Sequence, residues 1–524
     1  MYRIYYNRII FKRLFYIAYR IITIKNKVYE TMLFNSINFL IFFPIVVIVF
    51  FTLPQKLKYI WLLIASYFFY ANINIMFVLL IFISTLVSYV GGLLMNQQKE
   101  KSNDKYVKYI MWSVIFINLG ALFFHKYFYF VVNNIISIFS IFNITINEPT
   151  FSIILPVGIS FYTFQIIAYV VDISRGSCKA EKNFINYALF IAFFPKLLAG
   201  PIERTNTFLP QLHEKKTFSY DNMVKGLQLM LFGYFLKMVI GDRAAILVNF
   251  VFENYEAYGG LEIVIAIIIY SIQIYADFFG YTMIATGVAQ VMGFKLVQNF
   301  NHPYFAISVS DYWKRWHMSL SLWLRNYVYI PLGGSRVSNI KLYRNIILVL
   351  LVSGIWHGAN WTYVVWGLMH GISMVLANMF KPFFIKFYDV FKVNTKCFSF
   401  TLMQIIITFI IVTSTRFVFV APDITTAFEY INRMFSVWNP WIFFDGSLYN
   451  MGLDRQNFYI LCVSIFVLFV ISLLQEKGIK IRESLSKQNI CFRWVIYYIA
   501  IIVILLYGVY GVGYDARNFI YFKF

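Results

Sequence analysis

The chain has 524 residues, of which 60% are hydrophobic and 13% are charged, whereas soluble domains have about 45–50% apolar and about 25% charged residues. This composition excludes a soluble protein, because its water-facing surface would carry large apolar patches. The same residue counts exclude collagen-like, disordered and disulfide-scaffold proteins. The net charge of +22 fits the basic loops of a membrane protein, and no basic-aromatic domain stands outside the apolar runs, so we expect no nucleic-acid binding.

The first 31 residues differ from the rest of the chain. Basic residues are interspersed among aromatic residues and isoleucines there, and this pattern predicts that segment 1–31 is amphipathic and lies on a membrane surface. A second interpretation is equally open: translation starts at Met32, which is followed at once by a membrane-entry sequence. In both cases we expect residues 32–524 to form one membrane domain.

From residue 37 onward the chain consists of apolar runs separated by short polar breaks. The runs 38–55, 59–98, 149–171, 345–380 and 494–514 contain no charged residue, and each is long enough for one or two membrane spans of about 20 residues. They lack the alternation of outer-membrane strands. The candidate spans are 37–53, 57–71, 73–95, 106–124, 127–142, 151–171, 184–199, 223–240, 261–279, 345–356, 361–380, 398–420, 458–474 and 494–513. We therefore predict an all-α, polytopic membrane protein with about 11 to 13 crossings and further re-entrant or interfacial helices.

Residues 310–334 predict an amphipathic helix at an interface or in a re-entrant segment. Trp313, Trp316 and Trp323 share one stripe at helical spacing, cations lie opposite, and His317 falls on the seam between the two faces. A plain interfacial anchor explains the tryptophans and cations, but not the histidine. Arg325 and Arg336 either bind a phosphorylated donor or are ordinary cytoplasmic charges, and the sequence leaves both interpretations open.

Two histidines, His357 and His370, fall inside the uncharged run 345–380. An ionisable group at this depth is a functional candidate, although a neutral histidine bonded to a backbone carbonyl is a structural alternative. Around His357, two glycines and Asn360 predict a broken helix, which survives in a membrane only where it is buried in protein or lines a wet cavity. Histidine can accept and return a proton near neutral pH. We expect His370 to have a structural or supporting role.

Other polar residues in apolar surroundings predict a hydrogen-bond network between helices. Gln273 and Asp277 share a helix face, and a buried carboxylate there requires a partner. The four cysteines are scattered, with no CxxC and no histidine at ligand spacing, so we expect neither a metal site nor a disulfide framework.

Five long segments together carry a family resemblance. They are PVGISFYTFQ (156–165), FFPKLLAGPIER (193–204), DYWKRWHMSLSLWLRNYVYIPLGGSR (311–336), GIWHGANWTYVVWGLMHG (354–371) and the terminal FIYFKF (519–524). In this order, from about Met32 to the end, the chain resembles the membrane-bound O-acyltransferases, in the branch of the bacterial alginate O-acetylation and D-alanyl transfer proteins. The departures are Lys196, Phe279, Tyr312 and Lys523, where Gln, Ser, Phe and Gln are commoner; they leave the histidines unchanged.

The resemblance implies a ring of tilted helices around a thinned centre, with a tunnel in which a cytoplasmic thioester meets a hydroxyl from the outer side. It implies that His357 and His317 are catalytic. The candidate substrate-binding residues are Trp313, Trp316, Arg325, Arg336, Trp356, Asn360 and His370. The donor would be acyl-CoA, in particular acetyl-CoA, or an acyl-carrier thioester used as co-substrate, with no bound cofactor.

The resemblance also implies partners and a location. The acceptor would be a polysaccharide or cell-wall polymer, reached through an extracytoplasmic partner, and the chain would cross the bacterial cytoplasmic membrane many times in contact with lipid. Two alternatives stay open at this point: a transporter or flippase of lipid-linked glycans, and a non-catalytic membrane scaffold. The absence of inverted repeats and the few carboxylates within spans favour the transferase over ion-coupled transport.

Overall fold

The computed structural model describes residues 32–510, and every regular element in that range is a helix. The predicted basic segment 1–31 and the terminal FIYFKF segment lie outside the described residues. The amino-terminal helices are α2 (Ile37–Thr52), α3 (Gln55–Ala71), α4 (Ile75–Glu100), α5 (Asp104–Leu122), the π-helical turn η1 (Phe123–Tyr127) and α6 (Phe128–Ile141). The all-α membrane fold predicted from composition and hydropathy is confirmed.

The middle of the chain alternates long helices with short ones. In order they are α7 (Ile159–Arg175), α8 (Phe184–Ala192), α9 (Phe194–Leu197), α10 (Thr205–Phe208), η2 (Leu209–Leu212), α11 (Tyr220–Tyr234), η3 (Phe235–Gly241), α12 (Asp242–Glu253), η4 (Tyr255–Ala257), α13 (Gly260–Val291), η5 (Pro303–Phe305), α14 (Val309–Arg315), α15 (Met318–Leu324) and η6 (Arg325–Tyr329). The short elements follow prolines, glycines and polar turns, which end a helix locally.

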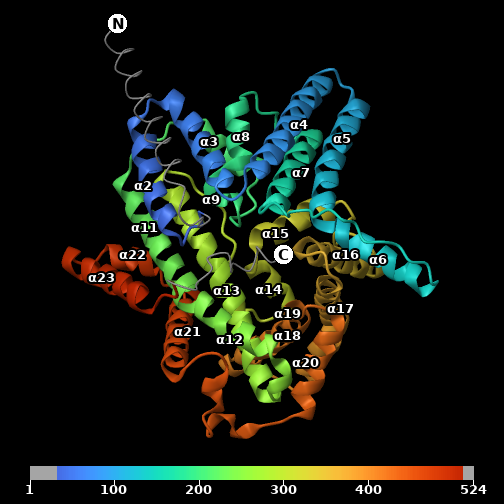
Figure 1. Cartoon of the computed structure of the whole chain (residues 1–524), viewed down its shortest axis with the longest axis vertical. Helices are drawn as coiled ribbons and strands as arrows, with labels where there is room; N and C mark the ends of the chain where they lie inside the picture. Colours follow the sequence, from blue (N-terminus) through green and yellow to red (C-terminus); the bar gives the residue numbers. More distant parts are fainter. Residues whose placement is uncertain (1–31, 511–524) are drawn as a thin grey trace.

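The carboxyl-terminal part begins with two long helices that pack on each other. It contains α16 (Asn339–His357), α17 (Trp361–Val390), α18 (Phe398–Ser414), α19 (Arg416–Val420), α20 (Ile424–Ser436), η7 (Pro440–Phe443), η8 (Ser447–Asn450), α21 (Arg455–Glu476), α22 (Ile481–Ser486) and α23 (Ile490–Tyr507). In Figure 1, α21, α22 and α23 lie together at one side, beside α11 and α13.

Eight helices in the described part are long and apolar enough to cross a bilayer, and α2 is a shorter apolar helix. The prediction of 11 to 13 crossings included segments that the structure divides. Residues 184–199 form α8 and α9, which have nine and four residues, too few to span about 30 Å of hydrocarbon. Conversely, the predicted spans 106–124 and 127–142 join into one helix, Asp104–Ile141.

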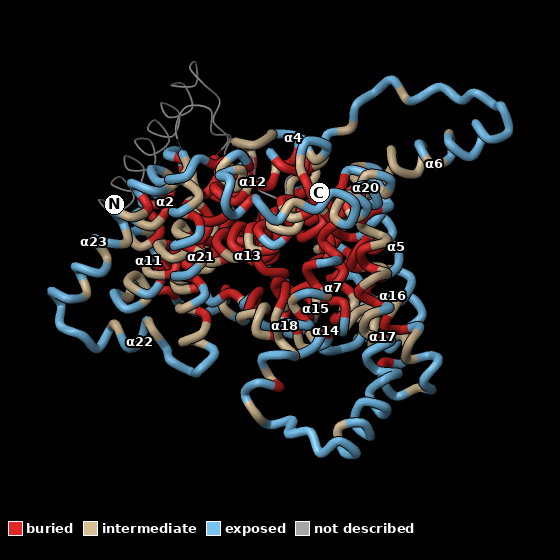
Figure 2. Tube along the Cα trace, turned by 90° about the horizontal axis from the view of Figure 1, so that it is seen from below, coloured by how far each residue is buried: buried red, intermediate tan, exposed pale blue. Residues whose placement is uncertain are grey.

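Helix α13 lies at the centre of the molecule (Figure 1), within the buried interior of Figure 2. It packs closely on α11 through glycines: a Cβ atom on Gly280 would lie 2.8 Å from the carbonyl oxygen of Gly233, and one on Gly226 would lie 2.6 Å from that of Gly287. Small residues allow such backbone approach between membrane helices, where lipid gives no hydrophobic driving force for association. The order of these contacts makes α11 and α13 antiparallel.

Asp277 on α13 belongs to a buried polar network whose cation was not predicted from the sequence. The carboxylate of Asp277 lies 2.5 Å from Nζ of Lys237, which is also 2.8 Å from Asp242. All three side chains are buried. Lys237 lies in η3, the π-helical segment between α11 and α12. The expectation that the Asp277 carboxylate has a partner is therefore met by a buried ion pair.

Candidate active site

The first candidate histidine lies at a sharp break between two short helices. Ser308 begins α14 by accepting the backbone N–H of Asp311, and the helix ends at Arg315. His317 has φ +40°, in the left-handed region that residues other than glycine rarely adopt, and α15 begins at Met318. The prediction of a single helix over this stretch is therefore wrong; its tryptophan stripe is buried in the protein.

The break at His317 has a cause outside the helix. The segment 299–301, which follows α13, bonds to both sides of the histidine: Met318 N donates to the carbonyl of Asn299, and Asn301 N donates to that of Arg315, each at 2.9 Å. These long-range bonds replace helical bonds on either side of His317. Unusual backbone held by its surroundings is common at functional sites.

The second candidate histidine ends a long helix, as predicted from the glycines around it. His357 is the last residue of α16. Helices α16 and α17 approach closely, because a Cβ on Gly354 would lie 2.2 Å from the carbonyl oxygen of Tyr363. A glycine at position 358 has no side chain and by itself would leave room for a group to approach the imidazole. The ring of Tyr363 takes that room, since a Cβ on Gly358 would lie 2.1 Å from it.

The two predicted histidines meet in space. The ring centres of His317 and His357 are 6.4 Å apart, and both residues are buried, with 0% and 4% of their surface exposed. Trp356 lies beside both, with ring centres 5.5 Å from His317 and 5.1 Å from His357. Of the two imidazoles only that of His357 lines a cavity, so side chains must move before one reacting group can contact both.

A small cavity contacts His357. Its volume is about 40 Å³, and its lining includes Lys126, Ser160, Trp356 and His357. A cavity of this size has room for roughly three water molecules, but not for an acyl thioester. The cavity at His357 is therefore too small to be the tunnel that the family resemblance implies, and side chains must move to admit a donor.

Sequence reasoning missed the lysine in this cavity. Nζ of Lys126 donates to the carbonyl oxygens of Trp356 at 2.7 Å and His357 at 3.1 Å, and it lies 3.4 Å from Oγ of Ser160. The carbonyls at the end of α16 lack helical partners, so the ammonium binds where the helix dipole is negative. We had placed Lys126 in a break between two spans. The sequence feature that could have identified Lys126 is a cation within a long apolar run, which forms one helix with a π-helical turn at this residue.

The third histidine lies in an aromatic layer next to the first two. Thr415 Oγ1 is 3.0 Å from Nε2 of His370, which is fully buried. The ring of Trp366 lies between the histidines, with its centre 4.9 Å from His370 and 5.2 Å from His357. Arg416, also missed from the sequence, is buried beside them.

Arg416 holds this layer together. Its Nη2 donates to the hydroxyl of Tyr312 at 2.9 Å, and its guanidinium carbon lies 4.9 Å from the ring centre of Trp316. Cation–π contacts of this kind are strongest where water is excluded. The departure from the family pattern at Tyr312, which adds a hydroxyl, is therefore matched by a buried arginine that bonds to it.

The remaining predicted residues divide into two groups. Trp313 contacts His370, with ring centres 5.2 Å apart, and so lies with Trp316 and Trp356 in the histidine cluster. Asn360 instead begins α17 by accepting the N–H of Thr362, and donates to the carbonyl of Pro422. Arg325 and Arg336 are exposed. The structure thus gathers the aromatic candidates around the histidines and leaves these two arginines at the surface.

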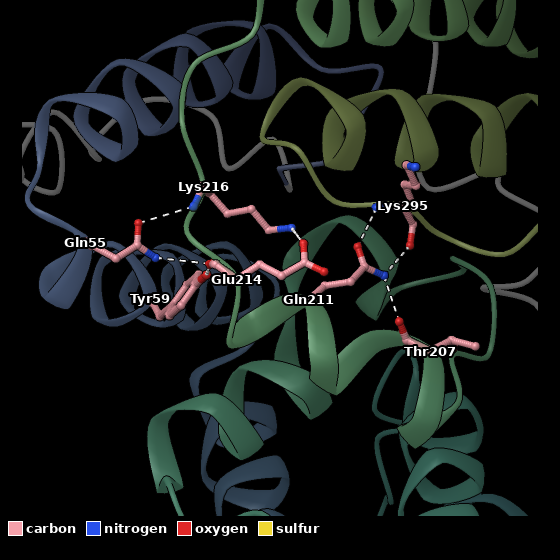
Figure 3. Close-up of polar contacts among 7 residues, drawn as sticks. All are labelled: Gln55, Tyr59, Thr207, Gln211, Glu214, Lys216 and Lys295. Carbon is pink, nitrogen blue, oxygen red and sulfur yellow. Dashed lines mark hydrogen bonds and ion pairs between the residues drawn. The ribbon is translucent and has the colours of Figure 1, made fainter.

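An outlying polar cluster fixes the segment that leads to this site (Figure 3). Gln211 bonds both to the N–H and to the carbonyl of Lys295, at 2.8 and 2.9 Å, and so holds the start of the segment that continues to Asn299. The carbonyl of Glu214 accepts a bond from Tyr59 on α3. A hydrogen bond from the Lys216 ammonium and its charge lower the pKa of the Glu214 carboxyl, so this contact persists as an ion pair at neutral pH.

The fold and the buried histidines define a polytopic membrane protein with a polar site within the bilayer. Residues 179–419 match the model of the membrane-bound O-acyltransferase family. The chain is 34% identical over 406 residues to the probable alginate O-acetylase AlgI of Pseudomonas aeruginosa, covering 77% of this chain and 75% of that protein. The chain therefore belongs to the membrane-bound O-acyltransferase family.

Two further relatives differ in the polymer that their names specify. The chain is 34% identical over 393 residues to the peptidoglycan O-acetyltransferase of Helicobacter pylori, covering 68% of this chain and 72% of that protein. It is 30% identical over 259 residues to the teichoic acid D-alanyltransferase of Bacillus subtilis, covering 45% and 62%. The protein is thus a membrane acyltransferase that uses an acyl donor as co-substrate, and family membership favours this over the transporter that the sequence left open.

Proposed function

We propose that the protein transfers an acetyl group from a thioester, either acetyl-CoA or an acyl carrier, to a hydroxyl of a cell-surface polymer or of an extracytoplasmic relay partner. The proposal places it in the cytoplasmic membrane of a bacterium. Relatives that cover most of the chain are named for acetyl transfer to alginate or peptidoglycan. The observation that carries the proposal is the pair of buried imidazoles, 6.4 Å apart, of which His357 lines a small cavity.

In the proposed mechanism His357 is the general base. Its imidazole removes the proton of the acceptor hydroxyl while the oxygen attacks the thioester carbonyl carbon. His317, held by the 299–301 segment, donates a hydrogen bond to the carbonyl oxygen as negative charge develops. Collapse of the tetrahedral intermediate breaks the carbon–sulfur bond, and the proton on His357 passes to the departing thiolate. No serine or cysteine of the sequence stands in a nucleophile-elbow motif, which favours direct transfer over a covalent acyl-enzyme.

Lys126 has a positioning role in this proposal. Its bonds to the last two carbonyls of α16 fix the turn that carries the His357 ring. We expect Lys126→Met to lower kcat roughly tenfold with little change in KM for the donor, because a slightly misplaced base slows the reaction without weakening donor binding. Lys126→Arg, which keeps the charge and the donors, should restore part of the rate. Equal losses in both variants, or a change confined to KM, would contradict the positioning role.

The experiment that tests the proposed function follows labelled acetyl into cell-surface polymer. Cells that lack the chain are complemented with wild type, His357→Ala or His213→Ala; His213 is an exposed histidine paired with Glu181 and serves as the control. We expect His357→Ala to lose about 10²- to 10⁴-fold of the incorporation at equal membrane abundance, and His213→Ala to lose none. Undiminished incorporation in both His317→Ala and His357→Ala would instead favour the scaffold interpretation.

A further inference from the structure

A cavity of about 1040 Å³ lies between α11 and α13 on one side and α21 and α23 on the other. In Figure 1, α21 and α23 lie at one side of the molecule, and α13 runs through its centre. The volume is at the upper end of the range for ligand sites, about 300–1,000 Å³. His317, His357 and His370 do not line it, so it is separate from the candidate active site.

The walls of this cavity are apolar and lie at membrane depth. Helices α13, α21 and α23 are each long and apolar enough to cross a bilayer, and Phe232, Met283, Val463 and Val503 contribute to the lining. Among the residues of α23, only Ile504 is buried, so this helix stands away from the core and leaves the space unfilled. Water gains few partners in such a space, whereas a hydrocarbon chain fits it.

One end of the cavity is polar. Because α11 and α13 are antiparallel, Gln228 and Gln290 lie toward the same end, and Gln228 donates to the hydroxyl of Tyr497 near the start of α23. The last turn of α21 reaches this end as well, since Glu476 pairs with Arg315, which bonds to the 299–301 segment. The cavity is therefore amphiphilic, with polar groups gathered at one mouth.

The mouth carries positive charge. Lys295 and Arg482 line it, and Lys477, Lys487 and Arg493 lie nearby in sequence. Two carboxylates of the same stretch are paired with other cations, Glu476 with Arg315 and Glu483 with Lys480. This end of the cavity therefore attracts an anionic group.

We propose that this cavity binds one membrane phospholipid with an anionic headgroup. The acyl chains lie along the apolar walls between α13 and α23, and the phosphate lies at the polar mouth, within reach of Lys295 and Arg482. Lysine and arginine donors suit phosphate oxygens, and the basic segment around α22 favours anionic lipids. An apolar body with one cationic end is complementary to a phospholipid.

The bound lipid is connected to the active site through the 295–302 segment. Its headgroup contacts the 295–302 segment, which Gln211 holds at Lys295 (Figure 3) and which bonds through Asn299 and Asn301 to both sides of His317. Occupancy of the cavity therefore supports the backbone that positions His317. This consequence for activity rests on the proposed function, whereas lipid binding itself does not.

The test measures lipid retained by the purified full-length chain. The protein is stripped with detergent, exposed to an equimolar mixture of phosphatidylglycerol and phosphatidylcholine, and examined by native mass spectrometry. We expect wild type to retain one phospholipid, with roughly tenfold preference for phosphatidylglycerol. Ala500→Trp fills the cavity from α23 and should abolish retention. Ile502→Trp, on the exposed face of the same helix, is the matched control and should retain lipid as wild type does.

A second variant tests the headgroup site without altering the core. Lys295→Gln/Arg482→Gln changes two exposed side chains, and we expect it to retain both lipids equally. Equal retention in Ala500→Trp and Ile502→Trp would overturn the proposal, as would a wild type that holds only detergent or a co-purifying peptide. An unchanged preference for phosphatidylglycerol in the double variant would overturn the assignment of the mouth as the phosphate site. Because these readouts do not involve acyl transfer, they are independent of the proposed function.

Discussion

Two of the membrane-crossing helices, α13 and α23, are both strongly apolar but pack in opposite ways. In the most apolar window of α13, 72% of the residues are buried inside the protein, against 6% for α23. Figure 2 shows the same contrast between the buried interior around α13 and the exposed tube of α23. Hydropathy therefore identifies both helices as membrane segments but does not distinguish the centre of the fold from its lipid-facing edge.

The difference lies in small and polar residues. Helix α13 carries Gly280 and Gly287, which admit the backbone of α11, and Asp277, which pairs with Lys237. Helix α23 is ICFRWVIYYIAIIVILLY, with no glycine, serine or threonine. Close packing and interhelical polar contacts hold membrane helices together, whereas bulky aliphatic side chains contact lipid equally well. The comparison predicts large effects of substitution at the centre and small ones at the edge.

The largest effect is expected for Lys237→Met. This change removes the cation shared by Asp242 and Asp277 and leaves two buried carboxylates, which should cost about 3–5 kcal/mol of unfolding free energy. Unfolding by SDS titration from mixed micelles measures the loss. Lys225→Met, which breaks the exposed pair with Asp221, is the control and should cost less than about 1 kcal/mol. Equal losses in the two variants would show that the central pair is not structurally important.

The next effect concerns the glycine contacts of α13. In Gly280→Ala the new methyl group would lie 2.8 Å from the Gly233 carbonyl oxygen and 2.9 Å from the Lys237 nitrogen. Both are backbone atoms that cannot move aside, so we expect a loss of about 1–3 kcal/mol. Gly120→Ala on α5, where no atom lies within 4 Å of the added Cβ, should leave the unfolding free energy unchanged or raise it slightly. Equal unfolding free energies of the Gly280→Ala and Gly120→Ala variants would contradict this prediction, because they would mean that α11 and α13 can separate without cost.

A smaller effect is expected near the third histidine. Thr415→Val keeps the shape of the side chain but removes the hydroxyl 3.0 Å from Nε2 of His370. Loss of one buried hydrogen bond should cost about 0.5–1.5 kcal/mol. Ser414→Ala, at the neighbouring exposed position, should be neutral. A neutral Thr415→Val would mean that the aromatic layer alone fixes the His370 ring.

The smallest effect is expected on the lipid-facing helix. Leu505 on α23 is 59% exposed, so Leu505→Ala exchanges contact with lipid or detergent and should change the unfolding free energy by less than about 0.5 kcal/mol. Val288 on α13 is fully buried, and Val288→Ala should cost more than about 1 kcal/mol by the same measurement. A large loss for Leu505→Ala would indicate that α23 packs against protein rather than lipid.

The sequence predicts the parts of this site that depend on local patterns. Uncharged runs identify the membrane fold, helical spacing places Trp313 and Trp316 on one stripe, and the glycines around His357 predict the end of α16. Family motifs identify both histidines, which the structure brings to 6.4 Å. Their catalytic roles stay a prediction.

The missed features depend on contacts between segments distant in sequence. The break at His317 comes from bonds to Asn299 and Asn301, which a helical pattern around the histidine cannot show. Lys126 meets the end of α16 only because α5 continues through a π-helical turn, where the predicted spans 106–124 and 127–142 leave a gap. The cavity beside α23 depends on how far that helix stands from α11, a distance that apolar composition leaves undetermined.

The most direct test of the histidine pair measures acetyl transfer from labelled acetyl-CoA in proteoliposomes that contain the polymer acceptor. His357→Ala, His317→Ala and the double variant are compared at equal reconstitution. If the two imidazoles act as a unit on one tetrahedral intermediate, each single variant should lose about 10²- to 10⁴-fold, and the double variant should be no slower than the slower single one. Wild-type transfer by His357→Ala would contradict the role of the histidine pair.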